Sequence, residues 1–302
     1  MSLIVTGSIG IDCVQTPSGH ANNVLGGSAV YFAAAASILT PVRLVAAAGE
    51  DFPAKSVQLL KKFDIDLGGL ELRPGSKTFR WSGKYHQNMN IRDTLSVQLN
   101  VLAEKLPPVP QPFQQTEYVF LANTHPGGQL ELLQQFPKRK LAVADTMDLW
   151  INNERPLLMK LLKKIDGLVL NDSEALLLTG ADDLLTAAEK VLKMGPKFVV
   201  IKKGEHGCML MHQQGVVVLP AYPTASVVDP TGAGDSFAGG MMGCLAAGKK
   251  KATLEDLRTA LAHGTILASF NIEAFSLNRL LKINKKDVTK RLEQYKKMLR
   301  IK

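Results

Sequence analysis

Short apolar runs alternate with stretches of helical periodicity between residues 118 and 201. Four of the runs have the length of buried strands, and each ends in a polar cluster, NTHPGG, DTMDLW, NDSE or KKGEHG. Such alternation predicts βαβ units and a parallel sheet. Because open α/β sheets bind ligands at the carboxyl ends of their strands, the polar clusters should lie at a ligand-binding edge. The strands are expected at residues 118–122, 141–144, 167–170 and 198–201, with helices at residues 129–136 and 157–164.

The N-terminal part of the chain shows the same pattern. An apolar run at residues 3–6 predicts the first strand, and Gly26 and Gly27 precede an alanine-rich stretch of helical character. A further strand is expected at residues 42–47. We therefore expect one doubly wound α/β domain over residues 1–302, in which a mainly parallel sheet lies between layers of helices.

Residues 68–100 have a different pattern. Polar and apolar residues alternate there with a period of two, which is typical of strands with one exposed face. We expect a small sheet apart from the main one. Its apolar face, with Phe79 and Trp81, is expected either to cover a site or to pair with a second subunit. The alternation places Thr78, Arg80, Ser82 and Lys84 on one face and Phe79, Trp81, Gly83 and Tyr85 on the other.

Cysteine usage and hydropathy indicate the cellular compartment of the protein. The chain of 302 residues is 46% hydrophobic and can bury a large core, but its three cysteines, Cys13, Cys208 and Cys244, lie far apart. This spacing indicates free thiols in a reducing compartment. Proline or polar residues interrupt the alanine-rich segments before they reach membrane-spanning length, so we expect a cytoplasmic protein without a membrane partner. The six histidines form no zinc motif.

The formal net charge of +9 raises the question of nucleic-acid binding. Much of the excess lies in the last segment, where apolar residues recur at helical spacing. One side of such a helix can dock while its basic side stays in solvent, so we expect no nucleic-acid partner. The docking positions are Val288, Leu292, Tyr295 and Leu299, and the basic positions are Lys282, Lys285, Lys286, Lys290, Arg291, Lys296, Lys297, Arg300 and Lys302.

The stretch DPTGAGDSFAGG, residues 229–240, contains the most unusual chemistry of the chain. Pro230 prevents a helix before it, and Gly232, Ala233 and Gly234 are too small to shield their own backbone amides. Residues of helical character follow. The small residues should therefore lie at a helix N-terminus, where free N–H groups and the positive end of the helix dipole favour a phosphate group.

Asp235 directly follows these small residues. One interpretation is structural, because an acid in the first helical turn serves as a cap and glycines allow a tight turn with close helix packing. The other interpretation is catalytic. Phosphoryl transfer to an alcohol needs a base for the hydroxyl proton and fixed donors for the charge that develops on the phosphoryl group. Composition alone leaves both open.

The motif resembles the C-terminal signature of the ribokinase family, the phosphofructokinase-B type carbohydrate and nucleoside kinases. The resemblance implies that Asp235 is the catalytic base and that Gly232, Ala233 and Gly234 form the anion hole. It also implies ATP as phosphoryl donor with Mg²⁺, and it leaves a monovalent cation open. No Lys-Ser or Lys-Thr follows the glycines, so the motif is not a Walker A loop. The matching positions are Asp229, Thr231, Gly232, Ala233, Gly234, Asp235, Phe237 and Gly240.

Residues near the N-terminus resemble the acceptor-binding part of the family. In the family's G-x-x-x-x-D pattern, here ending at Asp12, the Asp binds sugar hydroxyls, although Asp12 taken alone is typical of a turn. Gly26 and Gly27 resemble the N-terminal signature, where the backbone approaches the substrate at a helix start. Tyr31 departs from the family, because many of its sugar kinases have Asn there. An aromatic ring at this position indicates a different acceptor or a pocket that stacks against a ring.

Two further motifs imply a nucleotide and metal site. Asn171 and Glu174 match the family's N-x-x-E motif, which organises Mg²⁺ and phosphate, usually through water. The structural alternative is a helix cap. Lys202, Gly204 and Gly207 resemble the segment that lines the nucleotide, although a plain turn between strands explains the same glycines. Asn271 lies in a small-residue helix that is expected to flank the adenine.

The resemblance also implies a ribokinase-like fold with a β lid. The lid strands are expected from about residues 13–25 and 68–100, and the lid should exclude water from the site and thereby limit transfer of phosphate to solvent. The same lid is expected to form a homodimer.

The sequence thus predicts an ATP-dependent kinase that phosphorylates a hydroxyl of a sugar, with its subgroup unassigned. Two alternatives stay open. One is a nucleoside kinase of the same superfamily, with Tyr31 stacked on a base. The other is a sugar or nucleotide sensor without turnover, although such a binder has no use for the base Asp235. An NAD-dependent oxidoreductase is excluded, because the first strand lacks G-x-G-x-x-G.

Overall fold

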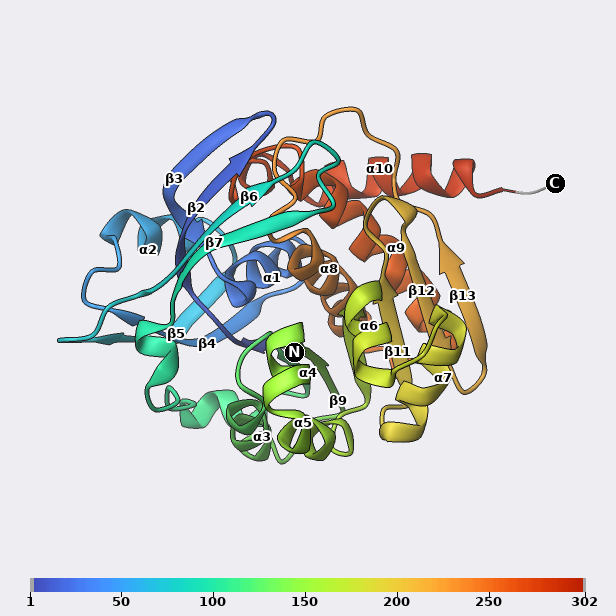
Figure 1. The fold of residues 1–302 in the computed structure, drawn as a ribbon, viewed down its shortest axis with the longest axis horizontal. Helices are drawn as coiled ribbons and strands as arrows, with labels where there is room; N and C mark the ends of the chain where they lie inside the picture. Colours follow the sequence, from blue (N-terminus) through green and yellow to red (C-terminus); the bar gives the residue numbers. More distant parts are fainter. Residues whose placement is uncertain (1–2, 301–302) are drawn as a thin grey trace.

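A computed structural model describes residues 3–300 and places a nine-stranded sheet at the centre of the fold (Figure 1). Its strands are β1 (Leu3–Thr6), β4 (Val42–Gly49), β5 (Ile65–Arg73), β8 (Tyr118–Leu121), β9 (Leu141–Asp145), β10 (Gly167–Asn171), β11 (Phe198–Lys202), β12 (Cys208–His212) and β13 (Gly215–Leu219). Their order is β13-β12-β11-β10-β9-β8-β1-β4-β5. Neighbours are parallel except in the two pairs that contain β12. The expected parallel strands are therefore confirmed.

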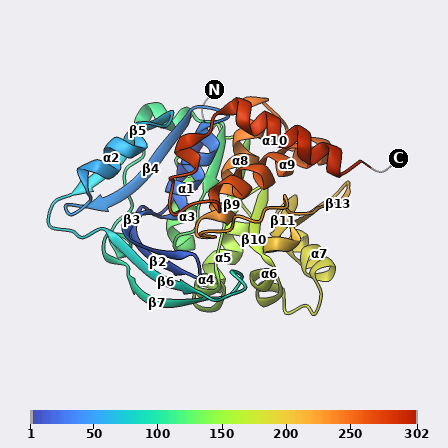
Figure 2. The same cartoon turned by 90° about the horizontal axis from the view of Figure 1, so that it is seen from above.

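Helices cover both faces of this sheet, so the domain has three layers (Figure 2). Successive residues of β1 enter different cores, since Leu3 and Val5 pack on one side and Ile4 on the other, as strand periodicity requires. The doubly wound α/β sandwich is thus confirmed. No helix between residues 3 and 300 is long and apolar enough to cross a membrane. One face carries α1 (Ser28–Ser37), α2 (Ala54–Leu60), α8 (Ala233–Ala247), α9 (Leu254–Asn271) and α10 (Lys285–Met298), and the other carries α3 (Pro126–Gln134), α4 (Asp148–Asn153), α5 (Arg155–Leu162), α6 (Asp172–Thr179) and α7 (Leu184–Met194).

Helix α8 lies between α1 and α9 in the middle of its layer. A Cβ atom at Gly239 would lie 2.3 Å from the carbonyl oxygen of Phe32 in α1. A Cβ atom at Gly240 would lie 2.8 Å from the carbonyl oxygen of His263 in α9. Only glycine allows backbones to approach so closely. This packing fixes the N-terminus of α8, where the DPTGAGD motif lies.

The basic C-terminal helix α10 docks on the domain as its apolar spacing predicts. Val288, Leu292 and Tyr295 are buried. Arg291, which we expected on the solvated face, is an exception. Its guanidinium pairs with Glu273 at 2.8 Å and lies 3.4 Å from the centre of the Phe270 ring. The reason is geometric, because residue 291 follows 288 by three positions and shares the docked face.

A separate four-stranded sheet forms the lid, from β2 (Gly10–Thr16), β3 (Gly19–Gly26), β6 (Phe79–Tyr85) and β7 (Arg92–Gln98) in the order β3-β2-β6-β7. The existence of the second sheet is confirmed, but the boundaries expected for it were wrong. Residues 68–73 belong to β5 in the main sheet, because Gly69 packs closely on the backbone of β4 and extends the pairing there. The first lid segment begins at Gly10, three residues earlier than predicted.

The lid has an inner face that points toward the carboxyl edge of the main sheet. Asp12 pairs in register with Trp81, and Gly10 pairs with Phe79, so these side chains share one face of the lid. Phe79 and Trp81 are half-buried on this inner face. The exposed apolar side chains lie instead on and around the edge strand β7: Ile91, Leu95, Val97 and Leu99.

Candidate active site

The site lies at the point where the strand order of the main sheet reverses. Strand β1 pairs with β4 on one side and with β8 on the other, and chain order runs outward in both directions from it. Crevices at such a switch point hold the ligands of open α/β sheets. The carboxyl ends of β9 and β11, the start of α8 and the inner face of the lid meet there (Figure 1).

Residues 229–235, called the anion loop below, lead into α8. Gly232 is the N-cap of the helix and has a φ of 73°, a conformation that suits glycine. The Tyr31 ring lies directly beneath it, since a Cβ atom at Gly232 would lie 2.2 Å from that ring. The first-turn N–H groups of a helix have no intrahelical partner. In this loop the Ala233 N–H donates to the Pro230 carbonyl oxygen at 3.1 Å, and the role of Gly232, Ala233 and Gly234 as an anion hole stays a prediction.

Asp235 occupies the first turn of α8 and is half-buried. Burial and the nearby carboxylate of Asp145 raise its pKa to about 7, against the opposing charges of Lys202 and Arg92. A carboxylate that titrates near neutral pH accepts a proton more readily than an ordinary Asp, which suits a general base.

Asp12 comes from lid strand β2 and is 3% exposed. Burial, followed by the charges of Asp229 and Asp235, raises its pKa to about 7. A Cβ atom at Gly26 would overlap the Asp12 carboxylate, so glycine at this position makes room for the side chain. Oxygen Oδ1 of Asp12 is buried and has no hydrogen-bond partner among the described residues. The structure thus brings Asp12, which we predicted to bind the phosphoryl acceptor, close to the predicted base Asp235.

Tyr31 does not offer a face to a ligand. The side chain is 1% exposed and supports Gly232 from below, so the expectation that Tyr31 stacks on an acceptor ring was wrong. Burial, with the charges of Asp12 and Asp229 next, raises the pKa of its hydroxyl well above the usual value. Periodicity correctly placed Tyr31 on a buried helix, but only the fold shows that the anion loop covers it.

Asn271 also supports the anion loop. It is 1% exposed and its Nδ2 donates to the carbonyl oxygen of Thr231 at 2.8 Å. This contact does not favour the predicted place beside the adenine. The last residue of α9 instead supports the anion loop through this hydrogen bond to its backbone.

Lys202 and Asp145 form an ion pair at 3.2 Å between the ends of β11 and β9. Burial opposes the charge on Lys202, but Asp145, Glu174 and Asp235 outweigh it and raise its pKa. A Cβ atom at Gly234 would lie 2.9 Å from Nζ of Lys202. The lysine therefore lies against the anion loop.

Asn171 and Glu174 form the helix cap that we considered as the structural alternative. The Asn171 side chain accepts from the Glu174 backbone N–H at 2.8 Å, and the Glu174 carboxylate accepts from the Asn171 N–H at 2.7 Å. Burial and the charge of Asp145 nevertheless raise the pKa of Glu174 to about 7. Its carboxylate thus lies in an excess of negative charge that a cation would relieve.

Gly204 and Gly207 lie in the turn between β11 and the antiparallel strand β12. Gly207 has a φ of 83°, and a Cβ atom there would lie 2.1 Å from the carbonyl oxygen of Leu219. Both glycines are therefore explained by the turn, and their nucleotide role stays a prediction.

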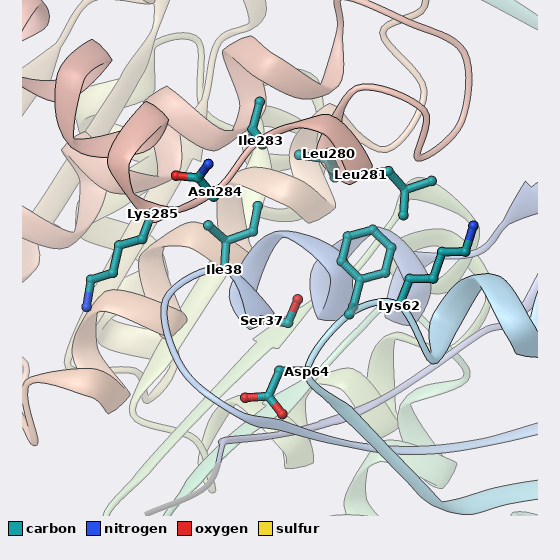
Figure 3. Close-up of a pocket in the computed structure, with 10 residues that line it drawn as sticks. Ser37, Ile38, Lys62, Asp64, Leu280, Leu281, Ile283, Asn284 and Lys285 are labelled. Atoms are coloured by element: carbon teal, nitrogen blue, oxygen red, sulfur yellow. The ribbon is translucent and has the colours of Figure 1, made fainter.

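A cavity of about 370 Å³ lies away from these residues, between the end of α1, the segment after α2 and the start of α10 (Figure 3). Its lining includes Ser37, Asp64 and Asn284, and none of the motif residues. Among residues 3–300, no group of three or more His, Cys, Asp or Glu side chains forms a metal-binding cluster.

Sequence reasoning missed two lid residues near the anion loop. Thr231 Oγ1 donates to the Tyr85 hydroxyl oxygen at 3.3 Å, and the charge of Arg92 acts on Asp235. Tyr85 belonged to a strand that we did predict, and its alternation with polar neighbours was the available signal. Arg92 lies in a strand whose side chains are all exposed, so the pattern of apolar and polar residues gave no sign that it lies near the site.

An anion loop followed by a carboxylate, at the switch point of an α/β sheet and under a β lid, defines a small-molecule kinase. The chain belongs to the pfkB family carbohydrate kinases, whose sequence profile matches residues 2–283. It is therefore a phosphotransferase with a hydroxyl group as acceptor, which confirms the family predicted from the motif.

Individual relatives agree with this assignment. The chain is 31% identical to the cytidine kinase of Thermococcus kodakarensis over 249 residues, which cover 80% of this chain and 87% of that protein. Two solved structures share the fold. One is a nucleoside kinase from Methanocaldococcus jannaschii, with a TM-score of 0.76, 21% identity and coverage of 97% and 98% of the two chains. The other is a ribokinase II candidate from Escherichia coli with bound ATP and Mg²⁺, with a TM-score of 0.79, 17% identity and coverage of 97% and 100%.

Proposed function

We propose that the acceptor is a nucleoside and that the chain transfers the γ-phosphoryl group of ATP to a hydroxyl of its ribose. The observation that carries this proposal is the inner face of the lid. Phe79 and Trp81 lie on one face of β6, and Asp12 lies on the same face of the sheet, paired with Trp81. A carboxylate suits ribose hydroxyls, and aromatic rings beside it suit a base. Similarity to a cytidine kinase over most of the chain supports the same choice over a simple sugar.

The roles of the site residues follow from their positions. Asp12 accepts hydrogen bonds from acceptor hydroxyls next to Gly26 and Gly27 at the start of α1. Asp235, whose charge acts on Asp12, takes the proton from the attacking hydroxyl. The backbone of Gly232, Ala233 and Gly234 is proposed to stabilise the charge on the transferring phosphoryl group, because these residues begin helix α8 and the first N–H groups of a helix have no partner within the helix. The Ala233 N–H donates to the Pro230 carbonyl oxygen at 3.1 Å in this structure, so it must leave that oxygen to take part.

The donor nucleotide is proposed to lie on the other side of the anion loop. Lys202 reaches the phosphates from the end of β11, and the turn with Gly204 and Gly207 lines the nucleotide, with Asn171 nearby in register with Lys202. Three cysteines without disulfide partners among the described residues, and the use of ATP, support a cytoplasmic location.

Mg²⁺ is proposed to bind near Glu174 and Asp145, mainly through water. These two carboxylates repel each other, and oxygen ligands that keep the metal hydrated suit this ion. When bound, the ion neutralises phosphate charge. A monovalent cation is proposed at Asp229, whose Oδ2 is buried without a hydrogen-bond partner among residues 3–300.

Glu174→Gln is expected to raise the Mg²⁺ concentration for half-maximal activity by about 10–100-fold. The amide oxygen can still accept from the Asn171 N–H, so the cap of α6 remains while the charge is lost. Mg²⁺ titrations of initial rate, with the melting temperature as a control for folding, measure this. An unchanged Mg²⁺ requirement would remove Glu174 from the metal site.

The acceptor proposal is tested by ADP release with ribose, fructose, sugar phosphates, cytidine, uridine and adenosine. We expect kcat/KM to be highest for a nucleoside. A sugar that exceeds every nucleoside would overturn the nucleoside assignment but leave the kinase assignment intact. Nucleoside binding without ADP release would instead indicate a sensor.

A second copy of this chain is proposed to cover the edge of the lid. Strand β7 is the last strand of the lid sheet and its residues are all exposed, so it presents unpaired backbone groups. Leu95 is 52% exposed and Val97 is 50% exposed, which is unusual for apolar side chains on an edge strand unless another chain pairs there.

Leu95→Lys is therefore expected to convert a dimer into monomers, as measured by light scattering after gel filtration. Val218→Lys is the matched control, because Val218 is 58% exposed on β13, the edge strand of the main sheet. A wild-type monomer, or dissociation by Val218→Lys alone, would contradict dimerisation through the lid.

A further inference from the structure

Gln129 is a buried polar side chain on a helix that otherwise packs through apolar residues. It belongs to α3 and is 1% exposed. Leu132 and Leu133 of the same helix lie in one apolar core with Leu121 of β8 and Ala144 of β9. Burial of a side-chain amide costs free energy unless the amide is hydrogen-bonded. The position of Gln129 therefore requires specific partners.

The side-chain nitrogen of Gln129 has three partners, and all are backbone carbonyl oxygens. Nε2 lies 3.0 Å from the oxygen of Leu121, 3.1 Å from that of Ala122 and 3.0 Å from that of Asp145. An amide has two hydrogens, so one of them is shared between two oxygens. Leu121 ends β8, Ala122 follows it, and Asp145 ends β9. Gln129 thus joins the carboxyl ends of two neighbouring strands.

The link lies where the pairing between these two strands ends. The last pair in register between β8 and β9 is Leu121 with Ala144. Ala122 and Asp145 come directly after that pair, so the sheet no longer holds them to each other. Buried carbonyl oxygens need a hydrogen-bond donor, and the Gln129 amide supplies one to both residues. An apolar residue at position 129 would fill the same space but leave the two chain ends unconnected.

Asp145 carries a carboxylate whose position matters for the site. It is 4% exposed. Its Oδ1 accepts from the Thr146 N–H at 2.8 Å, and its Oδ2 lies 3.2 Å from Nζ of Lys202. Its charge also acts on Asp235. Both carboxylate oxygens are therefore held, and the bond from Gln129 fixes the backbone from which this side chain extends.

We propose that Gln129 is a positioning residue of the active site, which acts through Asp145. By holding the backbone at the end of β9, it places the Asp145 carboxylate for its pair with Lys202 and for the Mg²⁺ proposed beside Glu174. This inference rests on the proposed function. Groups that orient a metal-binding carboxylate typically change metal affinity when they are removed, although they do not touch the metal.

Gln129→Met is expected to weaken Mn²⁺ binding about 10-fold, measured by electron paramagnetic resonance with ADP present and no acceptor. Met has nearly the size of Gln, so the packing of α3 is kept while the three carbonyl oxygens lose their donor. Mn²⁺ and Mg²⁺ share a preference for carboxylate and water ligands. No turnover takes place in this mixture, so the result reports binding alone.

Leu133→Ala is the matched control. Leu133 lies one turn after Gln129 on α3 and is 2% exposed. Its truncation should lower the melting temperature by about 5–10 °C and leave the Mn²⁺ affinity unchanged, because it removes packing without touching the end of β9. Gln129→Asn is a milder second variant, which carries the test if Gln129→Met does not fold. It keeps an amide on a shorter side chain and should weaken Mn²⁺ binding less.

A double-mutant cycle tests whether Gln129 acts through Asp145. Asp145→Asn removes the carboxylate charge but keeps an oxygen that can accept from the Thr146 N–H. In this background Gln129→Met should change the Mn²⁺ affinity little, because the charge that it positions is already gone. Two residues that act independently would instead have additive effects.

Three outcomes would overturn the proposal. One is a wild-type Mn²⁺ affinity in Gln129→Met. The second is an equal loss of affinity in Leu133→Ala, which would indicate general loosening of α3. The third is full additivity with Asp145→Asn. Failure of the proposed nucleoside acceptor is distinct, because wild-type protein would then release no ADP with any nucleoside, whereas the Mn²⁺ measurements need no acceptor.

Discussion

Asp235→Asn lowers kcat by about 10²–10⁴-fold while the affinity for ATP stays nearly the same. Asn has the same size as Asp, so the packing at the start of α8 is preserved. What disappears is the group that takes the hydroxyl proton. Steady-state kinetics with the best nucleoside, and ATP binding measured by calorimetry, test both parts of this result.

Asp172→Asn is the matched control for this change. Asp172 also lies in the first turn of a helix, α6, but it is exposed and accepts only from the Ser173 N–H at 2.9 Å. If Asp235 served only as a helix cap, the two variants would have similar, small effects. Turnover close to wild type in Asp235→Asn would therefore remove the proposed base.

The raised pKa of Asp235 also fixes the direction of the pH dependence. The base must be ionised, and its pKa is about 7, so kcat/KM should fall as the pH drops through about 7. Ionisation of Asp235 is harder in the folded protein than in the unfolded chain, where the pKa has its ordinary value of 3.8. The free energy of unfolding that Asp235 contributes is therefore present at low pH and is lost as the pH rises from that value through about 7. Asp235→Asn, which carries no charge, should then be more stable than the wild type at pH 8.

Gly232→Ala is expected to lower both stability and activity strongly. The φ of 73° costs a non-glycine residue about 1–2 kcal/mol. The new methyl group would also lie 2.2 Å from the Tyr31 ring, and such overpacking costs a further ~1–3 kcal/mol. Because the ring is buried and cannot move away, the anion loop must shift. A displacement of about 1 Å in a catalytic group is enough to lower the rate about 10²-fold.

Gly75→Ala separates the two contributions. Gly75 has a φ of 77°, nearly that of Gly232, but a Cβ atom there has no neighbour within 4 Å. It should show only the backbone cost and full activity. Urea denaturation and kcat measured on both variants provide the comparison. Equal losses in the two proteins would mean that the Tyr31 contact does not position the loop.

The sequence predicted the main sheet well because its strands are short, apolar and regularly spaced. The runs at residues 3–6, 141–144 and 198–201 have few alternatives once helices separate them, and the structure confirms each. The edge of the lid was harder. The alternating pattern from residue 68 suggested a change of element there, whereas Gly69 allows β5 to pack on β4. A glycine in the sequence shows only that a small residue is present. It does not show which neighbouring segment requires that small size.

Contacts across the site were the least predictable feature. Asp12 and Asp235 were both identified, yet they are 223 positions apart, and nothing local indicates that their charges interact. Tyr31 was expected to face a ligand because of its residue type, but it faces Gly232. Such relations depend on packing between distant segments, which periodicity and motif spacing do not encode.

The central claim is that the chain moves the γ-phosphoryl group of ATP to a nucleoside hydroxyl. Its most direct test is mass spectrometry of the products formed from ATP, Mg²⁺ and cytidine by the wild type and by Asp235→Asn. We predict cytidine that has gained one phosphoryl group, in amounts equal to the ADP formed, from the wild type only. ADP without a phosphorylated nucleoside, or equal product from both proteins, would contradict it.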